Sequence, residues 1–128
     1  MNNWYLLGLT VLLGLGACNN NLNNEQAALL EGQWLFEDGQ INQQQQGIEL
    51  LKNLKFEFKD QQISCELLPE MNPAFNATES YILKDGIIEI REKLQMRLKS
   101  IDQDSMMLEF TLSLGGEESS YSLLFKRL

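Results

Sequence analysis

The feature that most constrains this chain is an alternation of apolar and polar residues in short runs along most of its length. Phe56 and Phe58 alternate with lysine and glutamate, and every second residue from Met106 to Leu114 is apolar. Successive side chains of a β-strand point to opposite faces, so each run predicts a strand with one buried face. Turn residues such as Asp85 and Gly86 separate the runs. The pattern predicts seven or eight short antiparallel strands.

A meander of one-sided strands exposes two sheet edges unless it closes, so we expect an all-β, up-and-down antiparallel barrel. The predicted inward-facing set is apolar and contains no charged residue; it comprises Phe56, Phe58, Tyr81, Leu83, Ile88, Ile90, Leu94, Met96, Leu98, Leu108, Phe110, Leu123 and Phe125. A barrel of this size is either filled by side chains or holds one small ligand. The number of large residues favours a filled core. The side chains expected to line a ligand cavity are Phe58, Tyr81, Met96, Met106 and Phe110.

The chain begins with an apolar run, 4–17, and has no charged side chain before Glu25. This run is shorter than the roughly 20 residues that cross a hydrocarbon core. It ends in small residues immediately before Cys18, as the core of a signal peptide does. Residues 1–17 are therefore predicted to be a signal peptide. An uncleaved apolar anchor and an ordinary secretory peptide are the alternatives.

The letters LGAC at 15–18 resemble the lipobox of bacterial lipoproteins. The resemblance implies that Cys18 becomes the acylated first residue of the mature chain and anchors it to a membrane. Asn19 stands where aspartate would signal retention in the inner membrane, which favours the outer membrane, facing the periplasm. We expect 18–24, rich in asparagine, to be a flexible tether and 25–30 to be a short helix.

In the remaining domain, 25–128, a short helix, the Gly-x-Trp at 32–34 and an up-and-down meander that ends in a basic residue resemble the pattern of the calycins. The segments LEGQW at 30–34, KSIDQDSMML at 99–108 and FKRL at 125–128 are similar to small lipocalin-like lipoproteins of Bacteroidetes. The resemblance implies that Trp34 closes one end of the barrel. It also implies that a basic side chain from the last strand, Arg127 or Lys126, lies across the tryptophan ring.

Two stretches break the alternation: 40–47, which contains four consecutive glutamines, and 68–80, which contains both prolines. We expect solvated loops there, or alternatively lids over a barrel mouth. Cys65 has no partner once Cys18 is acylated, and it is expected to be a small buried hydrophobic residue rather than a reactive thiol.

Composition excludes several classes of function. The net charge of −8, from 18 acidic and 10 basic residues, argues against nucleic-acid binding. The chain has no histidine, so it lacks the usual general base and the commonest metal ligand. We expect no catalytic residues, no metal site and no cofactor.

The function expected is therefore that of a cell-envelope lipoprotein that binds a small apolar molecule without catalysis. The alternative is a rigid barrel with a filled core that binds an envelope protein through the loop 43–46 or its acidic surface. A cavity lined by Met96, Met106 and aromatic rings would favour the ligand. A filled core beside an exposed apolar patch would favour the protein partner.

Overall fold

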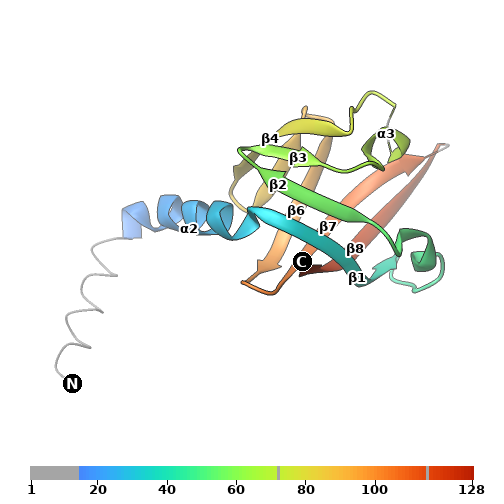
Figure 1. Ribbon diagram of the computed structural model, residues 1–128, viewed down its shortest axis with the longest axis horizontal. Helices are drawn as coiled ribbons and strands as arrows, with labels where there is room; N and C mark the ends of the chain where they lie inside the picture. Colours follow the sequence, from blue (N-terminus) through green and yellow to red (C-terminus); the bar gives the residue numbers. More distant parts are fainter. Residues whose placement is uncertain (1–14, 72, 115) are drawn as a thin grey trace, which may run out of the picture.

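The computed structural model describes residues 15–71, 73–114 and 116–128. Eight antiparallel strands form a closed barrel in which each strand pairs with the next and β8 pairs with β1 (Figure 1). The predicted all-β, up-and-down barrel is thus confirmed. The strands are β1 Gly32–Ile41, β2 Lys55–Lys59, β3 Gln62–Ser64, β4 Thr78–Lys84, β5 Ile87–Ile90, β6 Leu94–Ile101, β7 Ser105–Leu114 and β8 Glu117–Arg127.

The core follows the alternation in the sequence. In β6, Leu94, Met96 and Leu98 are buried while the residues between them are exposed. The predicted inward positions are buried, except for the half-buried Leu83. The predicted inward-facing set omits one charged residue: Glu79 is in phase with Tyr81 on β4 and is only 6% exposed. Its burial is possible because an arginine and a backbone N–H contact its carboxylate.

Strand β1 is longer than predicted and depends on two glycines. Gly32 has φ of 128°, a conformation that residues with a side chain rarely adopt. A β-bulge follows Phe36, and at Gly39 a Cβ atom would lie only 2.6 Å from the backbone oxygen of Ser122. The bulge bends β1 around the core, and Gly39 lets β8 approach it closely.

The helix before the barrel is also longer than predicted. Helix α2 spans Leu15–Leu30, so the residues 18–24, expected to be a flexible tether, belong to the helix. Asparagine is a weak helix former, but adding a residue to an existing helix costs much less than starting one. Of the predicted signal peptide, 1–14 lies outside the described residues. Among the residues that the structure describes, no helix is long and apolar enough to cross a membrane.

Candidate functional site

The two ends of the barrel differ in their connections. At one end α2 enters β1 and short turns join the strands; at the other end lie the two long connections, 42–54 and 65–77. These carry the 3₁₀ helix η1, Ile48–Leu51, and the helix α3, Leu68–Met71. Figure 1 shows α2 and α3 on opposite sides of the barrel. We call the end with η1 and α3 the open end.

At the closed end Arg127 covers Trp34. The guanidinium carbon lies 4.1 Å from the centroid of the indole ring, while Lys126, the other basic candidate, is exposed. Arg127 also donates hydrogen bonds to three backbone oxygens: those of Gln103 at 2.6 Å, of Glu31 at 2.8 Å, and of Leu29. One side chain therefore ties α2, the β6–β7 turn and the last strand together.

The β6–β7 turn that meets Arg127 is held by Asp102. Its Oδ1 accepts the backbone N–H groups of Asp104 and Ser105, both at 2.8 Å. These hydrogen bonds hold the pKa of the exposed Asp102 carboxyl below its ordinary value. The closed end is thus a site of structural contacts, with its polar groups used to fix the chain.

An apolar cleft of about 270 Å³ lies at the open end. Its innermost side chains are Leu123 and Phe110, which are 0% and 6% exposed. The Phe110 ring stacks on Tyr121, with ring centroids 5.1 Å apart. The other residues around the cleft come from β1, η1, the segment before α3, α3 itself and β7; they are Ile41, Gly47, Leu50, Leu51, Leu67, Glu70 and Leu112.

The rim of this cleft exposes a large apolar side chain. Leu50 is 84% exposed, whereas Leu51, the next residue of η1, is half-buried against the core. A 3₁₀ helix of four residues cannot turn two adjacent side chains to the same face. The stretch 40–47 precedes η1, and Pro69 lies within α3; both helices border the mouth of the cleft.

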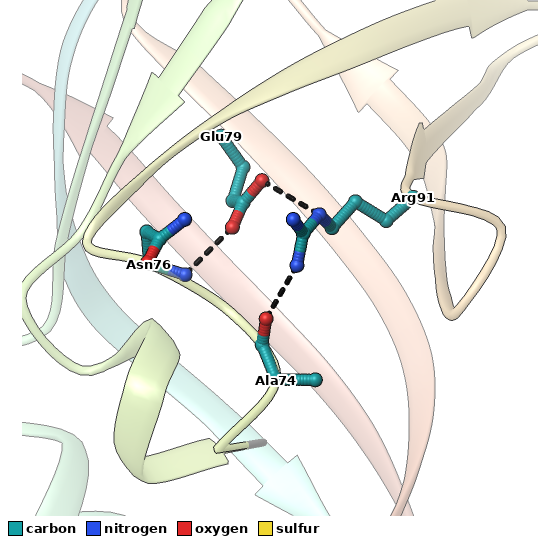
Figure 2. Close-up of polar contacts among 4 residues, drawn as sticks. All are labelled: Ala74, Asn76, Glu79 and Arg91. Carbon is teal, nitrogen blue, oxygen red and sulfur yellow. Dashed lines mark hydrogen bonds and ion pairs between the residues drawn. The ribbon is translucent and has the colours of Figure 1, made fainter.

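An ion pair between the buried Glu79 and the partly exposed Arg91 fixes the loop after α3 to the barrel. The Glu79 carboxylate accepts Arg91 Nε at 3.1 Å and the backbone N–H of Asn76 at 2.6 Å, and Arg91 Nη1 donates to the Ala74 oxygen at 2.5 Å (Figure 2). Arg91 belongs to the β5–β6 turn and is 46% exposed. Strand β4, the β5–β6 turn and the loop after α3 are thus joined at the open end.

The structure separates the five side chains that the sequence predicts to line a cavity. Phe110 lines the open-end cleft. Phe58, Tyr81, Met96 and Met106 belong to the packed core, and the rings of Phe58 and Tyr81 meet edge to face with centroids 5.3 Å apart. Met96 and Met106 are 1% and 0% exposed. These four residues therefore fill the barrel.

Cys65 is buried, as predicted, and no partner holds it in a disulfide. Burial raises the pKa of its thiol above the ordinary value, and the Glu66 carboxylate adds to this effect. The thiol is therefore protonated at neutral pH, where it is a poor nucleophile. In the described part of the chain no three cysteine, aspartate or glutamate side chains gather as metal ligands do.

Sequence reasoning missed the residues that build the open end. Glu79 could have been found, because it continues the alternation two residues before Tyr81. Leu50, Leu67 and Leu112 come from three separate segments, and only the folded loops bring them to one cleft.

No protein-family model matches the chain, and no curated protein matches it. What the chain does must therefore be inferred from the geometry of the two barrel ends.

Proposed function

We propose that this chain is a lipid-anchored lipoprotein of the bacterial cell envelope whose barrel binds a protein partner at its open end without catalysis. The anchor is the acylated Cys18, supported by the lipobox-like letters at 15–18. The barrel is lipocalin-like in this proposal, and Asn19 favours the outer membrane, facing the periplasm. Two or more acyl chains hold a protein stably on a membrane, because each methylene buried in the bilayer adds about 0.8 kcal/mol to the free energy of membrane binding.

The observation that carries the protein-partner proposal is a filled core beside an exposed apolar rim. Met96, Met106 and Phe58 pack in the interior, where a carrier barrel would keep space for its ligand. At the rim Leu50 is 84% exposed above the half-buried Leu51 and Leu67. Apolar side chains at such a position favour the burial of a partner's surface.

A second candidate is a small apolar ligand in the open-end cleft, and the shape of the cleft favours it. Leu123, Phe110 and the half-buried Leu112 form an apolar pocket. Its volume of about 270 Å³ lies just below the range of ordinary ligand pockets, about 300–1,000 Å³. At about 30 Å³ for each water-sized group, the cleft holds roughly nine non-hydrogen atoms, so a larger ligand would protrude from the mouth.

The anchor is tested by replacing Cys18. The Cys18→Ser variant is expected to move from the membrane fraction to the soluble fraction of its host, since serine does not form the thioether to diacylglycerol. Cys65→Ser is the matched control and is expected to remain with the membranes, carrying its acyl mass in intact mass spectra. A Cys18→Ser chain that stays in the membrane fraction would show that another segment holds it there.

The open end is tested by placing a charge on its rim. Leu50→Glu is expected to weaken partner binding about tenfold or more, because the carboxylate would have to be desolvated in the interface. Ile82→Glu is the control, since Ile82 is 63% exposed on the outer face of β4. The measurement is chemical cross-linking in the native host, followed by native mass spectrometry of the purified chain.

The mass spectra separate the two candidates. A cross-linked protein that persists with Ile82→Glu and is lost with Leu50→Glu supports the protein partner. A small extra mass that leaves on denaturation supports the apolar ligand. A wild-type chain with neither, while the acyl mass on Cys18 is intact, would contradict binding at the open end.

A further inference from the structure

The barrel wall has a gap beside the open end. Strands β6 and β7 pair from Ile101 and Met106 up to Arg97 and Glu109, and there the ladder stops. Residues 94–96 of β6 continue to pair with β5, and residues 110–114 of β7 continue to pair with β8. Two strand edges therefore diverge toward the open end. We call the space between 94–96 and 110–113 the seam.

The direction of the backbone groups along β7 can be derived from its neighbours. Ser120 of β8 turns its backbone toward β1, because its oxygen accepts the Asn42 N–H at 2.7 Å and its N–H is donated to the Asn42 side chain at 2.9 Å. Thr111 is the residue opposite Ser120. In an antiparallel pair the N–H and C=O of one residue point to the same side. Those of Thr111 therefore point away from β8 and into the seam.

The edge of β6 also turns backbone groups into the seam. Leu98 donates its backbone N–H to the Gly86 oxygen at 2.7 Å, on the β5 side of β6. Gln95 is three residues away, so its backbone groups point to the opposite side, into the seam. Ser113, two residues after Thr111, repeats the orientation of Thr111. The side chains of Gln95, Thr111 and Ser113 are all exposed, so water and ligands reach this edge.

A polar groove of about 640 Å³ follows the outside of the seam. Lys93 and Gln95 line it from the β6 side, and Thr111 lines it from the β7 side. Phe110 and Tyr121 border both this groove and the apolar cleft. The edge of β7 therefore divides a polar surface outside the barrel from an apolar surface at its mouth.

We propose that the partner contributes an extended segment that adds to β7 as a further strand at the seam. This inference rests on the proposed function and names the form of the partner. Free backbone groups on an edge are satisfied best by another extended backbone. Because alternate side chains of a strand point to opposite faces, every second residue of the segment is apolar and faces the mouth, while the others are polar and face the groove.

Charge makes the segment basic. Glu117 and Glu118 are both exposed on the β7–β8 hairpin, and Glu118 lies opposite Ser113 at the end of the free edge. Along the groove Glu92 and Glu109 balance Lys93 and Arg97, so the hairpin sets the sign of the charge. A segment with lysine or arginine at the polar positions nearest this hairpin is attracted to it. A second copy of this chain is disfavoured, since it carries the same glutamates and a net charge of −8.

The test uses the full chain and a synthetic nine-residue peptide of alternating valine and lysine with capped ends. We expect the peptide to bind and to slow hydrogen exchange at the Thr111 and Ser113 amides about tenfold or more. The control peptide has the same sequence and charge but carries N-methyl groups on alternate residues, which removes the donors of one edge. If the seam recognises a backbone, N-methylation of the edge that meets β7 weakens binding about tenfold or more.

Protein variants complete the test. Thr111→Pro removes an N–H that faces the seam and that β8 does not use, and Thr111→Val keeps it. Binding lost in the folded proline variant and retained in the valine variant supports strand addition. The double variant Glu117→Lys, Glu118→Lys is expected to bind the peptide more weakly. The affinity that remains should also depend less on salt concentration. If Thr111→Pro does not fold, the N-methylated peptide alone decides.

Each other result counts against the proposal. Equal binding of the two peptides would show attraction by charge alone and overturn strand addition. Protection that arises from concentration-dependent dimers would make a second copy the occupant. If Thr111→Pro keeps the cross-linked partner that Leu50→Glu loses, strand addition fails while the proposed function stands. If the wild-type chain forms no cross-link to any protein, that result would instead contradict the proposed function.

Discussion

Replacing Arg127 with alanine is expected to lower the free energy of unfolding by about 2–4 kcal/mol and the melting temperature by about 10 °C or more. The side chain lies 4.1 Å above the Trp34 ring and donates to three backbone oxygens from two separate segments. Those oxygens, on Leu29, Glu31 and Gln103, would lose their donor together. Calorimetry of the variant with α2 intact measures the effect.

Two further variants identify the source of this effect. Lys126→Ala removes a positive charge from the exposed neighbour and is expected to change stability by less than about 0.5 kcal/mol. Arg127→Lys keeps the charge over the indole but cannot donate in three directions with a rigid fork, so it should restore only part of the loss. Equal melting temperatures for Arg127→Ala and Lys126→Ala would remove Arg127 from this role.

The strands could be predicted from the sequence because their signal is local. Burial of one face requires only that every second residue of a strand be apolar. Phe56 and Phe58 meet this requirement in β2, and Leu94 begins such a run in β6. Closure followed from the number of one-sided strands. The length of α2 could not be predicted in this way. Residues 18–24 are helical because they continue the helix between 15–17 and 25–30, and that continuation is not a local signal.

The open end could not be predicted, because it depends on contacts between distant segments. Nothing in the neighbourhood of Leu50 or Leu67 indicates that their loops meet over Leu123. The seam could not be predicted from the sequence either, since Gln95 and Thr111 lie in regular runs of alternating apolar and polar residues. Only the register of β7 with its two neighbours shows where the pairing stops.

The second large effect is expected from Arg91→Ala, which leaves the Glu79 carboxylate buried without its cation. Removing one partner of a buried ion pair costs about 3–5 kcal/mol, and we expect the lower end of this range because Arg91 is 46% exposed. Arg91 has φ of 54°, which alanine tolerates no better than arginine, so the strain of the turn is unchanged. Urea unfolding measures the loss, and Glu92→Ala in the same turn is the control.

A double variant shows whether the buried charge causes the loss. Glu79→Gln keeps the shape and the acceptor for the Asn76 N–H but carries no charge. In the Arg91→Ala background it should therefore recover about 1–2 kcal/mol, instead of adding a second loss. Hydrogen exchange at the Asn76 amide reports the loop directly, and it should accelerate in Arg91→Ala and slow again in the double variant. Additive losses would mean that Arg91 acts only through its hydrogen bond to Ala74. The loop beside the cleft would then be held by that bond, and the inward position of Glu79 would be independent of its partner.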